Sequence, residues 1–256
     1  MRAAISKAEI ESEVAGRFAN AFKLQEKPPV AVVSTGISEV DSLTGGLPRG
    51  AITEIFGSAS SGRTSFMISA LTYATTHEEV CVLIDTNDTF DPISAAGAGL
   101  NLERLLWIRC AANVEHAFKA ADLLLQGGGF GIVVLDIGDV RGTEARRIIS
   151  SWWYRFRRVV ENTPTALLVV AEDSCVRSCA SLALKLNREV DVWSSVSQTS
   201  NADIFNGLSL VTPHPTTNIP THSHLFSTLQ LQGSRQRPVH LGAGEIQFRA
   251  RARYLP

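Results

Sequence analysis

The sequence predicts an α/β fold with a mostly parallel central sheet flanked by helices. From residue 50 to about residue 195, apolar segments of strand character alternate with segments of helical character, which is typical of crossover units whose helices cover a parallel sheet. A Gly-rich loop joins the first of these strands to the first of these helices. Two strand-like segments end the sequence, and we expect them to pair as antiparallel edge strands.

An amphipathic helix is predicted near the start of the chain, over residues 4–22. The apolar residues on one face of this helix are Ile10, Val14, Phe18 and Phe22. The KPPV segment then ends the helix, so we predict an N-terminal helix and linker over residues 1–30. Two interpretations are equally open: the helix packs on its own core, or it mediates self-association or partner docking.

The predicted core spans residues 31–195. Its strands are ITEIF (52–56), VCVLID (80–85), LLWIRC (105–110), GIVVLDI (131–137), ALLVVA (166–171) and EVDVW (189–193). The helices with the clearest pattern are FMISALTYAT (66–75), VEHAFKAADLLLQ (114–126) and an Arg-rich segment within residues 141–160.

The last quarter of the chain changes character. Residues 196–223 cluster Thr, Pro, Asn and His with little periodicity, which predicts a mobile insertion. Residues 224–256, which include HLFSTLQLQ and GEIQFRARAR, are expected to complete the core. His214, His222 and His224 suggest a metal site, but the lack of cysteine or carboxylate partners disfavours one.

Residues 57–64 match the phosphate-binding pattern G-x-x-x-x-G-K-S/T, except that Arg63 replaces the lysine. In such a loop, backbone N–H groups at the start of the next helix hold phosphates. Arginine exchanges a compact ammonium for a planar fork, so we expect altered nucleotide binding and poor hydrolysis. Thr64 would coordinate Mg²⁺. The candidate nucleotide-binding residues of the loop are Gly57, Ser58, Ala59, Ser60, Ser61, Gly62, Arg63, Thr64 and Ser65.

The stretch from Ser34 to Ser65 closely resembles the RecA recombinase family, whose members carry similar STG, LD, GGLP, EI and SSG segments in this order. The resemblance continues through LIDTNDTFDP (83–92), LNLERLLWIRC (100–110) and GIVVLDIGDV (131–140). SLALKLNREVDV (181–192) resembles the strand region that follows the family's second DNA loop. The resemblance covers residues 30 to about 195, and it implies an ATPase core that binds ATP or ADP with Mg²⁺.

A narrower resemblance is carried by GRTS, LLWIRC, AADLLLQGGGFGIVVLD and CASLALKL. These segments are similar to short RecA-like proteins of the ImuA type, which accompany an inactive Y-family polymerase homologue and an error-prone DnaE-type polymerase in damage-induced mutagenesis. The resemblance implies RecA, that polymerase homologue and single-stranded DNA as partners.

The resemblance places the Walker B aspartate, which holds Mg²⁺ through water, at Asp136; burial at a strand end without that role is the alternative. Asn87, two residues after Asp85, stands where the family has the glutamate that activates the attacking water. An amide cannot accept the proton of that water. We therefore assign no catalytic base, and the adjacent Asp88 is the candidate substitute.

Two further departures from the family concern the nucleotide. Ser94 stands where bacterial recombinases place a tyrosine against the adenine ring. Glu172 and Asp173 stand where the family carries a glutamine that senses the γ-phosphate, and acidic groups there would repel it. We expect weak or absent ATP turnover.

The family's DNA loops are shortened, with only about ten residues between Glu172 and the ALKL segment, so we expect strand exchange to be lost. Instead, arginines and aromatic residues alternate in residues 141–160, a pattern that suits single-stranded DNA. On a helix, however, the aromatic side chains share a face that favours core packing. The candidate DNA-binding residues are Arg141, Arg146, Arg147, Arg155 and Arg158. A second cluster, which either extends a polynucleotide-binding or protein-docking surface or is a solvated edge, comprises Arg235, Arg237, Arg249, Arg251 and Arg253.

The formal net charge of −1 does not indicate nucleic-acid binding by itself. No apolar run approaches the ~20 residues of a membrane helix, and the start lacks the apolar core of a signal peptide, so we expect a cytoplasmic protein. The cysteines Cys81, Cys110, Cys175 and Cys179 lack C-x-x-C spacing, which favours reduced thiols.

Three functions are consistent with these patterns. The first is an accessory protein of translesion DNA synthesis in the SOS response, with degraded ATP hydrolysis. The second is a DNA-dependent ATPase or recombinase that uses Arg63 and an alternative base. The third is a RecA-fold inhibitor of cell division. Asn87, Glu172 and the shortened loops favour the first function over the second, and the Arg-rich segments disfavour the third.

Overall fold

The computed structural model describes residues 31–140, 150–195, 224–242 and 244–251. The helix predicted over residues 4–22 and the insertion predicted over residues 196–223 lie outside these residues. In the described part of the chain, no helix is both long enough and apolar enough to cross a membrane.

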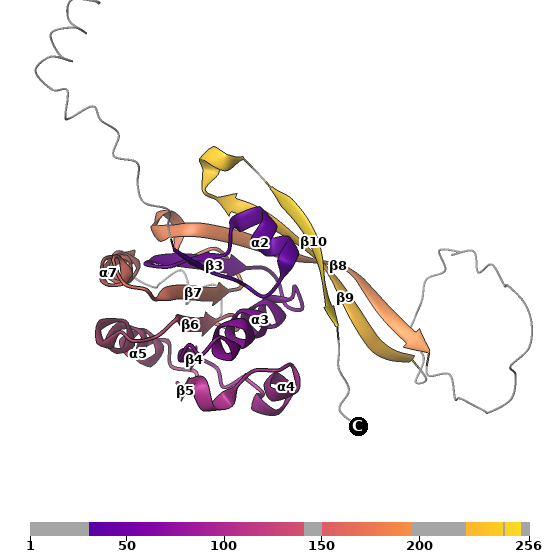
Figure 1. Ribbon diagram of the computed structural model, residues 1–256, viewed down its shortest axis with the longest axis horizontal. Coiled ribbons are helices and arrows are strands. Elements are labelled where there is room, and N and C mark those ends of the chain that lie inside the picture. The colour runs from indigo at the N-terminus through magenta and orange to yellow at the C-terminus, as the bar shows by residue number, and fades with distance from the viewer. Residues whose placement is uncertain (1–30, 141–149, 196–223, 243, 252–256) are drawn as a thin grey trace, which may run out of the picture. The chain divides into compact units, whose positions relative to one another are not determined.

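An eight-stranded sheet forms the centre of the fold (Figure 1). Its strands are β3 (Ala51–Phe56), β4 (Cys81–Asp85), β5 (Leu105–Arg109), β6 (Ile132–Ile137), β7 (Ala166–Ala171), β8 (Ala180–Ser195), β9 (His224–Arg237) and β10 (Glu245–Arg251). Their spatial order is β10-β9-β8-β3-β7-β6-β4-β5. The pairs from β8 to β5 are parallel, whereas β9 pairs antiparallel with both β8 and β10. The predicted α/β class and the antiparallel C-terminal edge are therefore confirmed.

The helices and short elements connect these strands. They are α2 (Ser38–Thr44), α3 (Arg63–Thr76), α4 (Pro92–Gly97), α5 (Val114–Gly127), α7 (Ser150–Val160) and the 3₁₀ turns η1 (Leu102–Arg104), η2 (Arg177–Cys179) and η3 (Val239–Leu241). A small two-stranded sheet pairs β1 (Val32–Val33) with β2 (Leu47–Pro48).

Two apolar cores cover the two faces of the sheet. On one face, Phe66 and Met67 of α3 pack with Ile55 of β3. On the other face, Phe118 of α5 and Phe156 of α7 pack with the opposite side of the same strands. Figure 1 shows α3 on one side of the sheet and α5 and α7 on the other. Strands that are buried on both faces read as continuous apolar runs, which is why their sequence signal is strong.

The aromatic residues of α7 take part in the second core. Trp153 and Phe156 are buried, and both rings contact the Phe118 ring of α5. The core interpretation of these aromatics is confirmed. Tyr154 differs, because its side chain is 58% exposed.

Strand β8 is longer than the EVDVW segment predicted for it. It begins at Ala180, pairs with β3 up to Lys185, and then continues in an antiparallel ribbon beside β9, whose other side pairs with β10. Figure 1 shows this ribbon extending beyond the rest of the sheet. Pairing on both sides explains the early start, because the polar Lys185 and Asn187 interrupt the apolar pattern without breaking the ladder.

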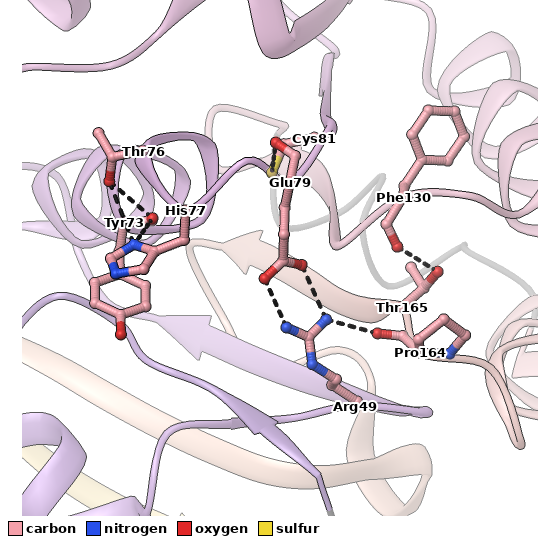
Figure 2. Close-up of polar contacts among 9 residues, drawn as sticks. All are labelled: Arg49, Tyr73, Thr76, His77, Glu79, Cys81, Phe130, Pro164 and Thr165. Atoms are coloured by element: carbon pink, nitrogen blue, oxygen red, sulfur yellow. Dashed lines mark hydrogen bonds and ion pairs between the residues drawn. The ribbon is translucent and has the colours of Figure 1, made fainter.

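The amino edge of the parallel sheet, where the strands begin, is held by a polar clamp (Figure 2). Arg49 Nη1 and Nη2 donate to the two Glu79 carboxylate oxygens at 3.0 and 2.7 Å, and Nη1 also donates to the Pro164 carbonyl at 2.8 Å. Thr165 Oγ1 donates to the Phe130 carbonyl at 2.7 Å. The clamp therefore joins the loops that precede β3, β4, β6 and β7.

Candidate nucleotide-binding site

The Gly-rich loop lies at the carboxyl edge of the sheet, between β3 and α3. A Cβ atom on Gly57 would lie 2.2 Å from the Leu186 carbonyl oxygen. Gly62 has a φ of 89°, and a Cβ atom there would lie 2.3 Å from Leu231 Cδ1. Strands β8 and β9 of the ribbon approach these two positions so closely that each requires glycine, and Gly62 requires it also because its backbone is left-handed.

The backbone of the loop leads directly into the first turn of α3. Ser61 N–H donates to the Ser58 carbonyl at 3.2 Å, and Gly57 N–H donates to the Glu172 carbonyl at 3.1 Å. The Ser61 hydroxyl is buried without a hydrogen-bond partner. Ser58, Ala59, Ser60, Thr64 and Ser65 are exposed. An exposed loop at the N-terminus of a 14-residue helix is a favourable place for an anion.

Arg63 is directed away from this loop. It is 8% exposed, and its Nη1 donates to the Gly138 carbonyl at 2.9 Å. Its Nη2 lies 4.0 Å from the Asp139 carboxylate. The guanidinium is therefore engaged with the loop after β6, on the neighbouring side of the site.

Asp136 closes the other side of the site at the end of β6. Burial raises the pKa of Asp136 to about 6, and the negative charges of Asp139 and Asp85 add to this effect. The Gly138 N–H, which donates to Asp136 Oδ1 at 2.9 Å, and the positive charge of Arg63 oppose it. A Cβ atom on Gly138 would lie 3.0 Å from both Arg63 Nη1 and Asp136 Oδ1, so only a small residue fits between the two side chains.

Asp85 is paired with Asp136 in the β4–β6 ladder, and its side chain stabilises the turn after β4. It is buried and accepts hydrogen bonds from the N–H groups of Thr89 and Phe90 at 3.1 and 3.0 Å. The Trp107 Nε1 also donates to it, at 3.2 Å. The Asp85 carboxylate thus organises the turn after β4.

The turn after β4 carries the two candidates for water activation. Asn87 is half-buried, and Asp88 has a left-handed backbone with φ 59°. Asp88 Oδ2 pairs with Arg109 at 3.1 Å, while its Oδ1 is buried without a partner. Arg109 holds Asp88 toward β5, and the assignment of Asp88 as a substitute base stays a prediction.

The comparison with known families is decisive for the fold family. The chain matches the family described as RecA N-terminal domain over residues 3–142, which is more than half of its length. It belongs to the RecA family. The matched residues include the Gly57–Ser65 loop, Asp85 and Asp136.

The RecA-family nucleotide with Mg²⁺ fits this site in part. The backbone of the loop and the exposed Thr64 hydroxyl fit a bound phosphate and its metal. The Arg63 side chain does not, because it is bonded to Gly138 instead. The pKa of Asp136, raised to about 6, leaves the carboxylate mostly ionised at neutral pH, so Asp136 fits a metal-binding role there and loses it as the pH falls below about 6.

A groove of about 400 Å³ lies beside the loop. Ser65, Ile68 and Thr72 of α3 line one wall, and Phe248 and Arg249 of β10 line another. Ser94 is outside this lining. It is exposed on α4, and its hydroxyl bonds to the Asp91 carboxylate, so it presents no ring against the groove.

The connection from β7 to β8, where RecA-family recombinases have their second DNA loop, is short and pinned. Glu54 of β3 is fully buried, and its carboxylate accepts hydrogen bonds from Ser174 Oγ at 2.8 Å, Cys175 N–H at 2.6 Å and Val176 N–H at 2.8 Å. Glu172 and Asp173 are exposed at the start of this connection. Glu54 was not among the predicted site residues, although a carboxylate inside the apolar ITEIF segment is a signal of a buried polar contact.

The candidate DNA-binding arginines have different surroundings. Arg141, Arg146 and Arg147 lie outside the described residues. Arg155 forms a two-point ion pair with Asp122 of α5, at 2.6 and 2.5 Å, so it joins two helices. Arg158 is exposed.

Proposed function

We propose that this chain is a RecA-like accessory protein of DNA-damage tolerance that acts in translesion synthesis of the SOS type. In this role it binds RecA, an inactive Y-family polymerase homologue that works with an error-prone DnaE-type polymerase, and single-stranded DNA. Its nucleotide pocket is retained mainly as structure, with weak or absent ATP hydrolysis. The action is cytoplasmic.

The observation that carries this proposal is the contact between Arg63 and Gly138. The one cation of the phosphate-binding pattern is buried and bonded at 2.9 Å to a backbone carbonyl. The Arg63 guanidinium would have to leave the Gly138 carbonyl before it could pair with a phosphate. Nucleotide binding is therefore weaker than with a lysine that is free to reach the phosphates.

The pinned β7–β8 connection supports the same proposal. A mobile DNA loop needs backbone that is released from the core, whereas Glu54 holds the N–H groups of Cys175 and Val176 in a buried site. Asn87 at the position of the family's water-activating glutamate supports it further, because an amide cannot take a proton.

ATP hydrolysis with and without single-stranded DNA, together with binding of a fluorescent ATP analogue, tests the pocket. The variants are Arg63→Ala and Arg63→Lys, with wild type beside them. We expect no DNA-stimulated turnover in wild type, little change with Arg63→Ala, and tighter nucleotide binding with Arg63→Lys. Turnover in wild type that Arg63→Ala abolishes would instead identify a working ATPase.

The second candidate function is that of a DNA-dependent ATPase or recombinase. The loop backbone and the position of Asp136 at the end of β6 favour it.

A separate capture experiment tests the partners of the accessory role: immobilised full-length protein is incubated with purified RecA and with the polymerase homologue. We expect retention of at least one of them by wild type and by Arg63→Ala alike. If neither is retained, the accessory role is wrong.

A further inference from the structure

Helix α7 presents arginines on two different flanks. Trp153 and Phe156 face the core, and Arg155 on one flank is bonded to Asp122 of α5. At 100° per residue, Arg157 lies on the opposite flank, away from α5. Arg157 is exposed, and its side chain forms no hydrogen bond or ion pair with the rest of the described chain.

The turn η2 lies against α7 and adds a second arginine to this region. Arg177 is exposed at the start of η2, two residues before the buried Cys179. Burial raises the pKa of Cys179, and the positive charges of Arg157 and Arg237 oppose this effect. Charges from α7 and from the end of β9 therefore both lie near the same thiol.

A β-bulge sends Arg237 to this face of the sheet. In the β8–β9 ladder, Ala183 is opposite Arg237 and Leu184 is opposite Arg235, so Gln236 is the extra residue. Residues that are directly opposite share a face, and Ala183 belongs to the core that includes α7. Arg237 is thus on the α7 face, whereas Arg235 is on the other face, where it donates to the Leu43 carbonyl at 2.8 Å.

An exposed aromatic side chain lies beside the arginines of α7. Tyr154 is 58% exposed and precedes Arg158 by one helical turn, so the two share a face beside Arg157. Glu161 is also exposed near the end of this flank. Even with this carboxylate counted, the region has a net positive charge from Arg157, Arg158, Arg177 and Arg237.

We propose that Tyr154, Arg157, Arg158, Arg177 and Arg237 form a binding surface for single-stranded DNA. The arginines contact successive phosphates, and an unpaired base stacks on the Tyr154 ring. This surface rests on the DNA-binding part of the proposed function, but it differs from the predicted residue set. Arg155 is excluded by its ion pair, Arg157 and Arg177 are added, and Arg237 of the second predicted cluster is brought to the α7 face by the bulge. An acidic protein surface would bind the same charges, but the exposed Tyr154 ring beside Arg157 and Arg158 favours a nucleic-acid base.

The test is fluorescence anisotropy of a labelled 20-nucleotide oligothymidine with the full-length protein at several salt concentrations. The charge variant is Arg157→Gln/Arg177→Gln. The control with the same change in net charge is Arg104→Gln/Lys119→Gln, on η1 and α5, where the two cations are paired with Glu78 and Glu115. Arg237→Gln is added to the first pair as a third change. Tyr154→Ala is compared with Leu123→Ala, which removes another exposed side chain.

We expect the charge variant to bind at least about 10-fold more weakly at low salt, and the control to stay within about twofold of wild type. Four phosphate contacts predict a wild-type slope of log K against log salt of about −3, which falls to about −1 in the triple variant. Tyr154→Ala should weaken binding about 5-fold or more, since stacking on an aromatic ring contributes at that level, and Leu123→Ala should not.

Three results would overturn the surface. Equal losses in the charge variant and its control would mean that only net charge matters. Wild-type affinity in the triple variant would place DNA elsewhere on the protein. Loss of polymerase-homologue capture with DNA binding retained would assign the surface to a protein partner. The capture experiment described under the proposed function tests the accessory role independently, so the absence of a DNA-binding surface would not by itself contradict that role.

Discussion

The two edges of the parallel sheet are built differently. At the amino edge, the Arg49 guanidinium satisfies both Glu79 oxygens and a backbone carbonyl. At the carboxyl edge, Ser61 Oγ, Thr86 Oγ1 and Asp88 Oδ1 are buried without partners. Buried polar atoms are usually paired because an unpaired one costs free energy. The difference indicates that the amino edge is built for stability and that the carboxyl edge keeps polar groups available for a ligand.

The largest expected effect concerns Glu54, in the middle of β3, which holds the β7–β8 connection. Glu54→Ala leaves the buried N–H groups of Cys175 and Val176 without their acceptor. We expect the free energy of unfolding to fall by about 4 kcal/mol, measured by urea denaturation. Glu54→Gln keeps one acceptor oxygen and should lose about half as much. A loss below about 1 kcal/mol in Glu54→Ala would show that the connection is not held by this carboxylate.

A pH-dependent effect is expected at Asp136. Its pKa is raised to about 6 in the folded protein, so folding favours the protonated form. The stabilising contribution of Asp136 to the free energy of unfolding is fully present below the pKa of the unfolded state, near 4, and is lost as the pH rises through about 6. Asp136→Asn should therefore stabilise the protein at pH 7 by up to about 3 kcal/mol, with no gain at pH 4.

Thermal unfolding of Asp136→Asn and wild type between pH 4 and pH 8 checks this prediction. The two curves should converge toward acidic pH. Parallel curves would mean that the Asp136 carboxylate is well solvated and that its charge does not destabilise the folded protein.

The close approach at the Gly-rich loop gives the next effect. In Gly57→Ala the new methyl group would meet the Leu186 carbonyl oxygen at 2.2 Å, and we expect a loss of about 2 kcal/mol in stability. Gly127→Ala is the matched control, because a Cβ atom at Gly127 meets no atom within 4 Å. Chemical denaturation of both should show a loss in the first variant alone. Equal stability of the two would mean that the ribbon does not press on the loop.

The smallest expected loss of stability is found by comparing substitutions of one arginine from each edge. Arg49→Ala breaks the contacts with Glu79 and Pro164, and we expect it to cost about 2 kcal/mol. Arg63→Ala removes one hydrogen bond to the Gly138 carbonyl and should cost about 1 kcal/mol or less. Urea denaturation ranks the two variants. The reverse ranking would contradict the view that the amino edge carries more of the stability.

Much of the fold could be predicted because its signals are local. Strands such as β6 and β7 are buried on both faces, so their residues form uninterrupted apolar runs. The loop between β3 and α3 was also predictable, since glycines at fixed spacing are needed for its turn. The apolar pattern predicted only EVDVW for β8, because the start of this strand depends on pairing with β3 and β9. The family resemblance, in contrast, implied a strand region over residues 181–192.

The sequence by itself determined the α/β class, the phosphate-binding loop with its arginine, and the apolar face of α7, because neighbouring residues along the chain specify each of them. The tertiary structure alone decided the partners of the polar side chains. Arg63 meets Gly138 across 75 positions, and Glu54 meets Cys175 across 121. Arg237 reaches the α7 face only through a bulge in the ribbon. Crossover connections and strand register bring such residues together, and neither leaves a periodic signal in the residues concerned.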